Sequence, residues 1–275
     1  MGKLGFFLIN LRYGIKHAFD WVEYARYLEY PLVFEKLGLA NAGSSCKFLD
    51  VGSGRFGKFA LYVALHTKCA IHSTDVGDYV FQQKNAFRRF GLGSALGSCI
   101  MIEQQDATRM SFASAQFDRI SCISVVEHIV GDGDIKAVKE MARVLKKGGR
   151  LVITVPYNPL KTGEESYVFA DKLYERTSRS GRIFLAKTYD DDTLTGRIIK
   201  PSGLSVKSIT YFGEPGFPWS RLIYDNNSYL VKLLTKPLGI LTPLFTFFFF
   251  REMPKSKFHN NDWQGVGACI VLEKR

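Results

Sequence analysis

The sequence predicts an α/β fold, in which seven mostly parallel strands form one sheet with helices on both faces and an antiparallel last strand. Three observations predict it. Short apolar runs of strand length alternate with helical patterns between residues 46 and 156. A glycine-rich turn, Gly52-Ser53-Gly54-Arg55-Phe56-Gly57, joins the first apolar run to the first of these helical patterns. Two further apolar runs, at 204–212 and 266–272, supply the closing hairpin of the sheet.

The composition describes a chain that can bury a full core. Of its 275 residues, 46% are hydrophobic, and a chain of this length forms one large domain or one domain with additions. The formal net charge of +11 suits an anionic partner, but the basic residues are spread along the chain, so nucleic acid is not favoured. The five cysteines include no CxxC pair. We therefore expect no metal site and a reducing, cytoplasmic compartment.

Residues 1–45 are predicted to form a helical cap ahead of the sheet. Apolar residues recur there at steps of three and four and define one helix face: Leu4, Leu8, Leu11, Ile15, Phe19 and Val22. We expect this face to pack on the domain, and a membrane-surface helix is the alternative. Pro31 disfavours helix at the residue before it, so a second, short helix is expected over residues 32–39.

The first strand, residues 46–51, runs into the glycine-rich turn, and a helix is predicted over residues 58–66. Glycine adopts backbone angles that a Cβ forbids and lets the chain lie close to a ligand. The turn matches GxGxxG, a pattern that suits many nucleotide sites and is weak by itself. Asp50, two places before the first glycine, narrows the choice. Its carboxylate would repel a pyrophosphate and would accept a hydrogen bond from an ammonium group.

Two further acids are expected at the same edge of the sheet. The second predicted strand ends in Asp75, which is placed to accept hydrogen bonds from ribose hydroxyls. NAD enzymes share this feature, and a helix cap is the alternative interpretation. The third strand is followed by Asp106 and Ala107. Alone, Asp106 is an ordinary turn residue, but parallel strands bring it to the edge that holds Asp50 and Asp75.

The fourth strand, residues 117–124, runs into Glu127 and His128. An amphipathic helix over residues 134–147 follows, and a glycine pair separates it from the fifth strand at 150–156. The fourth strand therefore brings an acid and an imidazole to the edge of the sheet at which ligands of such folds bind.

Beyond the fifth strand the pattern is less regular. Residues 157–187 are polar and are expected to form a loop with a short helix over the substrate mouth. The acidic triplet at 190–192 is expected to begin a helix and not to bind a metal. An insertion, residues 213–263, contains the apolar run 237–250, which is shorter than the ~20 apolar residues of a membrane span. A buried lid helix, an interfacial membrane patch and a dimer contact are the three interpretations of this run.

In the order of these pieces, the sequence resembles the class I S-adenosylmethionine-dependent methyltransferases that act on quinones, lipids, sugars and other small acceptors. The resemblance covers about residues 46–157. It rests on Asp50 with the glycines after it, on Asp75, and on an apolar strand that ends near Glu127 and His128. The third glycine of the family's loop is displaced here by one position, which affects only the detailed path of the loop.

The resemblance implies a Rossmann-like core over residues 46–212, preceded by the cap 1–45 and followed by the insertion 213–263 and a final strand at 264–275. It implies S-adenosylmethionine as the cofactor, with the glycine loop around its amino-acid part and acids facing its ribose and adenine. The residues expected to bind it are Asp50, Gly52, Ser53, Gly54, Asp75, Val76, Asp106, Ala107 and Ser124. The acceptor is expected to be a small molecule or a compound linked to a lipid or glycan.

His128 is the candidate catalytic residue, because it follows the fourth strand at the ligand-binding edge and can act as a base. Alternatively, Glu127 and His128 only position backbone around the cofactor. Methyl transfer is an in-line displacement, so the alignment of donor and acceptor is the main task of the protein. Asn158-Pro159 follows the fifth strand, whereas the similar motif of amino-methylating nucleic-acid enzymes follows the fourth, which disfavours nucleic acid as the substrate.

Two rival functions use the same sequence features. One is an NAD(P)-dependent oxidoreductase with the same glycine loop, and the other is a non-catalytic interaction protein that keeps the fold. We expect a cytoplasmic protein. Peripheral membrane contact through residues 237–250 and a homodimer are further hypotheses.

Overall fold

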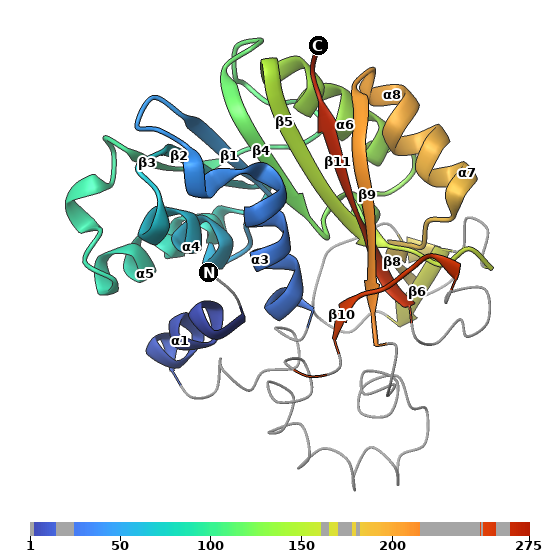
Figure 1. Cartoon of the computed structure of the whole chain (residues 1–275), viewed down its shortest axis with the longest axis horizontal. Helices are drawn as coiled ribbons and strands as arrows, with labels where there is room; N and C mark the ends of the chain where they lie inside the picture. Colours follow the sequence, from blue (N-terminus) through green and yellow to red (C-terminus); the bar gives the residue numbers. More distant parts are fainter. Residues whose placement is uncertain are drawn as a thin grey trace, which may run out of the picture.

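In the computed structural model, an eight-stranded sheet forms the centre of the molecule (Figure 1). The structure describes residues 3–14, 25–160, 165–169, 178–179, 182–214, 248, 250–256 and 265–275. The strand order is β10-β9-β11-β5-β4-β1-β2-β3. The strands β1 to β5 are parallel, and β11 runs antiparallel to both β5 and β9. The predicted α/β fold is therefore confirmed, with eight strands in place of seven.

The strands lie close to the apolar runs that predict them. Their bounds are Lys47–Val51 (β1), Ala70–Asp75 (β2), Ile100–Gln104 (β3), Phe117–Ile123 (β4), Leu145–Pro156 (β5), Ser205–Gly213 (β9), Arg251–Glu252 (β10) and Gly265–Glu273 (β11). The glycine pair 148–149, which was expected to end a helix, lies inside β5 instead.

Helices cover both faces of the sheet (Figure 1). One face carries α1 (Lys3–Tyr13), α3 (Arg26–Leu37), α4 (Lys58–His66) and α5 (Gln83–Arg89). The other carries α6 (Gly133–Val144) and a helical run made of α7 (Asp191–Thr193), η6 (Leu194–Ile199) and α8 (Lys200–Ser202). Single helical turns connect these elements: η2 (Leu39–Asn41), η3 (Asp78–Gln82), η4 (Gly93–Ala95) and η5 (Val126–His128).

Successive residues of β1 point to opposite faces of the sheet, as in any strand. Phe48 is buried in the core on the α3 and α4 side, and Leu49 in the core on the α6 side. Burial on both faces accounts for the continuous apolar run. Asp50 has the same parity as Phe48 and therefore lies on the face that α3 and α4 cover.

The described residues before β1 include the helices α1 and α3, but the predicted buried face of the first helix is wrong. Leu4 and Leu8 are 60% and 56% exposed, whereas Phe6 is fully buried. The ring of Phe6 packs edge-on against the rings of Tyr27 and Tyr30 in α3, with centroids 5.2 and 4.8 Å apart. These aromatic contacts select the face. The part of the predicted face from Ile15 to Val22 lies outside the described residues.

The predicted helix break at Pro31 is also wrong, because Pro31 lies inside α3. A proline in a helix interior costs roughly 3 kcal/mol or more. Burial of Leu32, Val33 and Leu37 on the same helix offsets that cost. The helix α3 therefore continues through Pro31, where one helix was expected to end and the next to begin.

The described part of the region 157–187 contains strands, and the expected short helix is not among these residues. Its described residues form a second, three-stranded sheet in the order β6-β8-β7, with bounds Glu165–Phe169 (β6), Ser178–Arg179 (β7) and Arg182–Lys187 (β8). Pairing within this sheet is antiparallel. Figure 1 shows β6 and β8 near the end of the main sheet that is opposite the C terminus.

Most of the insertion lies outside the described residues, including 237–247 and 249 of its apolar run. Within the described part, Phe250 is buried against Phe212, with ring centroids 5.9 Å apart, and Phe248 is exposed. The strand β10 pairs with β9 and supplies the eighth strand. The lid, membrane and dimer interpretations stay predictions. None of the helices in the described ranges has both the length and the apolar character needed to cross a bilayer.

Candidate active site

The glycine-rich turn links β1 to α4 at the carboxyl edge of the parallel strands. Gly52, Gly54 and Gly57 have φ angles of +72°, +69° and +54°, which favour glycine. A Cβ at Gly52 would lie 2.4 Å from the side chain of Val125, and one at Gly57 would lie 2.4 Å from that of Gln83. A Cβ at Gly54 would meet nothing within 4 Å. The turn is therefore packed on two sides and open at Gly54, where a ligand can approach the backbone.

Gln83, the first residue of α5, stabilises this turn through hydrogen bonds of its side chain. Its buried side chain donates from Nε2 to Ser53 Oγ at 2.7 Å and to the carbonyl oxygen of Gly54 at 2.5 Å. Its Oε1 accepts a hydrogen bond from Ser73 Oγ at 2.7 Å. Gln83 could not be predicted as a site residue, because a glutamine in a helical pattern carries no signal of the loop that the helix will cover.

Asp75 ends β2 beside the turn, as predicted, and its side chain is well satisfied within the chain. The Oδ2 atom accepts a hydrogen bond from the backbone N–H of Gly54 at 2.8 Å. The Oδ1 atom accepts one from the hydroxyl of Tyr79 at 2.7 Å. The next residue, Val76, is 63% exposed. Asp75 therefore already orders the turn, and ribose hydroxyls would have to share or replace its present donors.

Asp50 lies beneath the turn and is only 2% exposed. Its Oδ1 accepts a hydrogen bond from Ser121 Oγ in β4 at 2.6 Å. Its Oδ2 has no hydrogen-bond partner among the described residues. Burial raises the pKa of Asp50 to about 7, although the Ser121 hydrogen bond opposes the shift. A positively charged group near Oδ2 would supply the missing donor and favour the ionised form.

Glu127 is a second buried carboxyl group at this edge, in the turn η5 that follows β4. It is 1% exposed, and its Oε2 has no hydrogen-bond partner among the described residues. Burial raises the pKa of Glu127 to about 8. Ionising a buried carboxyl group that lacks a partner for one oxygen is costly, and a positive charge placed near that oxygen would favour the ionised form.

His128 follows Glu127, and its side chain is partly exposed, with Nε2 3.8 Å from Glu127 Oε1. Its Nδ1 lies 2.7 Å from the carbonyl oxygen of Leu185 in β8. Because a carbonyl oxygen only accepts, Nδ1 carries the proton. The lone pair of the neutral ring is then on Nε2, which is the state that a base requires. The second sheet thus fixes the tautomer of the predicted catalytic residue.

Ser124 is the last predicted cofactor residue, and the contacts of its hydroxyl were not foreseen. Its Oγ donates to Glu29 Oε1 in α3 at 2.9 Å, and Thr154 Oγ1 of β5 donates to the same oxygen at 2.8 Å. Arg26 donates to the other oxygen of Glu29. Glu29 is only 2% exposed. Glu29 was not predicted as a site residue, because the expected helix break at Pro31 gave this segment no defined partner.

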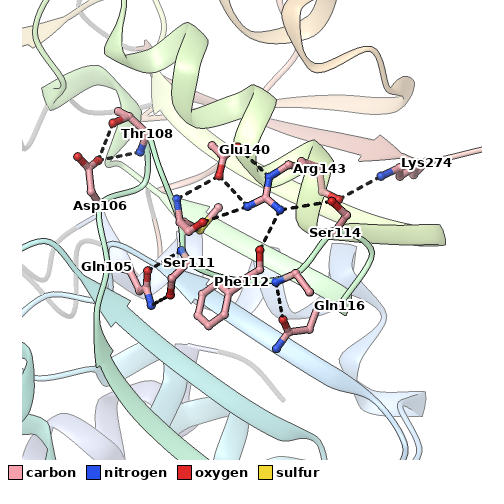
Figure 2. Close-up of polar contacts among 12 residues, drawn as sticks. Gln105, Asp106, Thr108, Ser111, Phe112, Ser114, Gln116, Glu140, Arg143 and Lys274 are labelled. Atoms are coloured by element: carbon pink, nitrogen blue, oxygen red, sulfur yellow. Dashed lines mark hydrogen bonds and ion pairs between the residues drawn. The ribbon is translucent and has the colours of Figure 1, made fainter.

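Figure 2 shows the loop after β3 that carries Asp106. Asp106 is exposed, and its Oδ1 accepts hydrogen bonds from the backbone N–H and the hydroxyl of Thr108, both at 2.8 Å. Asp106 is thus a turn residue in this structure, as expected when Asp106 is considered without Asp50 and Asp75. Its contact with adenine stays a prediction.

The same loop is fixed from α6 by an ion pair between Arg143 and Glu140 (Figure 2). Arg143 donates to the carbonyl oxygens of Phe112 at 2.8 Å and Met110 at 3.1 Å. Glu140 Oε2 accepts a hydrogen bond from the backbone N–H of Met110 at 3.0 Å. The loop therefore has a defined position next to the ends of β2 and β3.

Comparison with known proteins identifies this core. Residues 49–153 match the family model described as a methyltransferase domain. Residues 49–153 therefore form a methyltransferase domain. A curated protein, methyltransferase GfsG from Streptomyces halstedii, is 35% identical over 121 residues, which cover 44% of this chain and 40% of GfsG. The chain thus spans about two fifths of the length of the curated relative that it matches.

The fold of this methyltransferase domain recurs in solved structures. Geranyl diphosphate C-methyltransferase from Streptomyces coelicolor A3(2), crystallised with Mg²⁺, geranyl diphosphate and S-adenosyl-L-homocysteine, has a TM-score of 0.56 and 13% identity, with coverage of 90% of this chain and 77% of that one. The [4+2]-cyclase SpnF has a TM-score of 0.55 and 17% identity, with coverage of 90% and 79%. At these identities, the similarity shows the fold alone.

The structure brings most of the predicted site residues of the methyltransferase domain to one edge of the sheet. Asp75 bonds to Gly54 directly, and Val125, next to Ser124, packs against Gly52. Asp106 and Ala107 follow the neighbouring strand β3. Which of these residues contact a cofactor stays a prediction.

Proposed function

We propose that the methyltransferase domain transfers a methyl group from S-adenosylmethionine to a small-molecule acceptor. The observation that carries this proposal is a pair of buried carboxyl oxygens, Asp50 Oδ2 and Glu127 Oε2, that have no partner among the described residues. Both acids belong to the strand ends that border the glycine turn. S-adenosylmethionine carries an ammonium and a sulfonium, which buried carboxylates attract, whereas NAD presents a pyrophosphate, which they repel. The site therefore favours the methyl donor over the dinucleotide of the rival function.

Within this proposal, the nine predicted cofactor residues divide by the part of the donor that each would hold. The amino-acid part falls to Asp50, Gly52, Ser53, Gly54 and Ser124, the ribose to Asp75, and the adenine to Val76, Asp106 and Ala107. The open space at Gly54 and the exposed side chain of Val76 support this division. A ribose would compete with Tyr79 and with the backbone of Gly54 for the oxygens of Asp75.

S-adenosylmethionine supplies an electrophilic methyl group on a positively charged sulfur. In the transfer, the acceptor atom bonds to the methyl carbon while the carbon–sulfur bond breaks, and its electron pair stays on sulfur. The domain must align the acceptor with that bond and exclude water. His128 Nε2 would take the proton of the acceptor, and Glu127 Oε1, 3.8 Å away, would stabilise the resulting imidazolium.

Calorimetric titration with S-adenosylhomocysteine and with NAD separates the proposal from its first rival. We expect binding of S-adenosylhomocysteine and no heat with NAD. Binding of NAD alone would overturn the proposal. The [4+2]-cyclase among the similar structures shows that this fold also supports another reaction, so binding must be followed by detection of methyl transfer from tritiated S-adenosylmethionine to a panel of small-molecule acceptors.

The role of His128 is tested with His128→Asn, whose amide can still donate to the carbonyl oxygen of Leu185. We expect affinity for S-adenosylhomocysteine within about twofold of wild type and a transfer rate about a hundredfold lower, as for the loss of a general base. An unchanged rate would show that His128 does not move the proton of the acceptor.

The finer proposal, that the acceptor is linked to a lipid, rests on the apolar run 237–250 with its basic flanks. Co-sedimentation with vesicles of phosphatidylglycerol tests it. We expect the full chain to sediment and a variant without residues 237–250 to stay in the supernatant. Equal sedimentation of the two proteins would remove this support for a lipid-linked acceptor.

A further inference from the structure

Ser124 is held in an unfavourable backbone conformation at the end of β4. Its φ angle is +50°. Among the described residues other than glycine, Ala115 alone shares a positive φ angle with Ser124. A side chain in this left-handed region is disfavoured, and such residues persist only where their surroundings hold them. Ser124 is therefore a place where the protein maintains strain beside its candidate donor site.

The group that holds Ser124 is the carboxylate of Glu29. Glu29 Oε1 accepts the hydroxyl hydrogen bonds of both Ser124 and Thr154, at 2.9 and 2.8 Å. The backbone N–H of Ser124 also donates to Thr154, to its carbonyl oxygen and to its hydroxyl, both at 3.1 Å. Hydrogen bonds to a buried carboxylate are stronger than those between neutral groups. The strained residue is thus tied to the end of the neighbouring strand through one oxygen of Glu29.

Glu29 can act in this way because α3 is itself fixed at its other end. Arg119 of β4 donates from Nε to the carbonyl oxygen of Leu37 at 2.8 Å. Arg150 of β5 donates from Nη1 to the carbonyl oxygen of Lys36 at 2.7 Å. Two cations from two strands therefore cap the C-terminal end of the helix, as the helix dipole favours. A rigid α3 delivers Glu29 to a defined point above β4 and β5.

The effect of Glu29 extends from Ser124 to the glycine turn and to His128. Val125 follows Ser124, and its methyl groups fill the space that a Cβ of Gly52 would need. The backbone N–H of His128 donates to the carbonyl oxygen of Val125 at 2.9 Å. A shift of Ser124 would thus move the neighbour of the glycine turn and the turn that carries the candidate base.

We propose that Glu29 is a positioning residue of the donor site, which acts through Ser124, and that α3 of the N-terminal cap is thereby an integral part of that site. This inference rests on the proposed function, because it assigns Ser124 and Gly52 to the methyl donor. It adds a residue from outside the matched segment 49–153. The chemistry of Glu29 is that of an anchor, since its oxygens are already engaged with Ser124, Thr154 and Arg26.

The first test measures the affinity of the full chain for S-adenosylhomocysteine by calorimetry. Glu29→Ala is expected to bind about tenfold more weakly than wild type, because Ser124 loses the partner that holds its strained conformation. Glu29→Gln keeps an oxygen that accepts both hydroxyl bonds and is expected to stay within about threefold. Glu35→Ala is the matched control, because Glu35 lies on the same helix with a 75% exposed side chain, and its affinity should not change.

The decisive variant is Ser124→Gly in the Glu29→Ala background. Glycine adopts a φ of +50° without strain, so the double variant is expected to recover affinity to within about threefold of Ser124→Gly alone. A merely structural role of Glu29 would not be repaired by a change at Ser124. Affinity of a folded Glu29→Ala protein equal to wild type, or no recovery in the double variant, would overturn the inference.

If Glu29→Ala does not fold, Thr154→Val decides instead. This change preserves the shape of the β5 residue and removes the hydroxyl that bonds to both Glu29 and Ser124. We expect affinity for S-adenosylhomocysteine to fall about threefold, and an unchanged affinity would count against the inference. Failure of wild type to bind S-adenosylhomocysteine would instead refute the proposed function, so the two failures are distinguishable.

Discussion

Two regions of the same sheet edge differ in how many of their carboxyl oxygens accept hydrogen bonds from the chain itself. At the end of β2, both oxygens of Asp75 accept hydrogen bonds, from Gly54 and Tyr79. At β1 and at the turn after β4, Asp50 and Glu127 each keep one buried oxygen without a partner among the described residues. The β2 region is therefore complete without a ligand, whereas the β1 and β4 region has two acceptors in need of a donor.

The difference indicates which part of the site each region serves. Asp75 fixes the shape of the glycine turn through its hydrogen bond with Gly54, and its oxygens can also accept hydrogen bonds from neutral hydroxyls. Asp50 and Glu127 are buried acids whose pKa values are raised to about 7 and about 8. A neutral hydroxyl would not compensate the burial of their charges, but a cationic group would. The difference supports the proposal that the positive end of the ligand lies over β1 and β4 and its neutral end over β2.

The largest expected effect concerns the free energy of unfolding of Glu127→Gln. Burial raises the pKa of Glu127 to about 8 in the folded state, from about 4.3 in an unfolded chain. The folded protein therefore binds more protons between these values, and its stability falls as the pH rises through them. Gln cannot ionise, so the free energy of unfolding of the variant should exceed that of wild type by on the order of 5 kcal/mol at pH 9.

Denaturant unfolding at pH 5 and pH 9 checks this prediction. At pH 5 Glu127 is protonated in the folded state and ionises only in the unfolded chain, so the advantage of the variant should shrink to about 1 kcal/mol. The exposed Glu35, changed to Gln, provides the control and should show no pH-dependent gain. Equal stability of wild type and Glu127→Gln at pH 9 would mean that Glu127 has a compensating partner.

A smaller effect is expected when methyl groups are added to the two sides of the glycine turn. Gly52→Ala places a Cβ 2.4 Å from Val125 at a φ of +72°, so strain and overpacking together should cost roughly 2–4 kcal/mol of stability. Gly54→Ala has the strain of a φ of +69° but open space around it, and should cost roughly 1–2 kcal/mol. Thermal unfolding of both variants ranks them, and a reversed order would contradict the packing of Val125 against the turn.

The smallest effect is expected at Asp75, whose two carboxyl oxygens both accept hydrogen bonds. Tyr79→Phe removes the hydroxyl that bonds to Asp75 Oδ1 at 2.7 Å. It leaves the other oxygen on Gly54. Loss of one hydrogen bond to a charged group should lower the free energy of unfolding by about 1–2 kcal/mol. No loss in denaturant unfolding would show that Asp75 does not depend on Tyr79, and would weaken the contrast between the two regions.

The elements around the site could be predicted because each has a local signal. Buried strands such as β1 and β11 appear as short apolar runs, and Gly52 marks the turn because its positive φ angle favours glycine. The positions of Asp50 and Asp75 follow from the parallel order of the strands. These features depend on a few neighbouring residues, so one sequence is enough to find them.

The parts that escaped prediction depend on contacts between distant segments. Glu29 lies on α3, which continues through Pro31 to the residues that fix its C-terminal end. Burial of the apolar face of α3 stabilises the helix despite this proline. Gln83 acquires its role when α5 folds over the turn. The strands β6 and β8 pair across a polar segment with no clear period. The exposed face of α1 shows that a regular apolar stripe, Leu4 and Leu8, does not select the buried face when aromatic partners lie on the other.

The central claim is that buried acids at the ends of β1 and β4 receive a cationic ligand, and proton release on binding tests it most directly. Titration of S-adenosylhomocysteine, whose ammonium group is positive, is carried out at about pH 6.5 in two buffers of different ionisation enthalpy. Because the pKa of Asp50 is raised to about 7 in the free protein, pairing with the ammonium should release about half a proton or more per ligand bound. Asp50→Asn should bind more weakly and release correspondingly less. Tight binding with no proton release, equal in wild type and Asp50→Asn, would contradict the account.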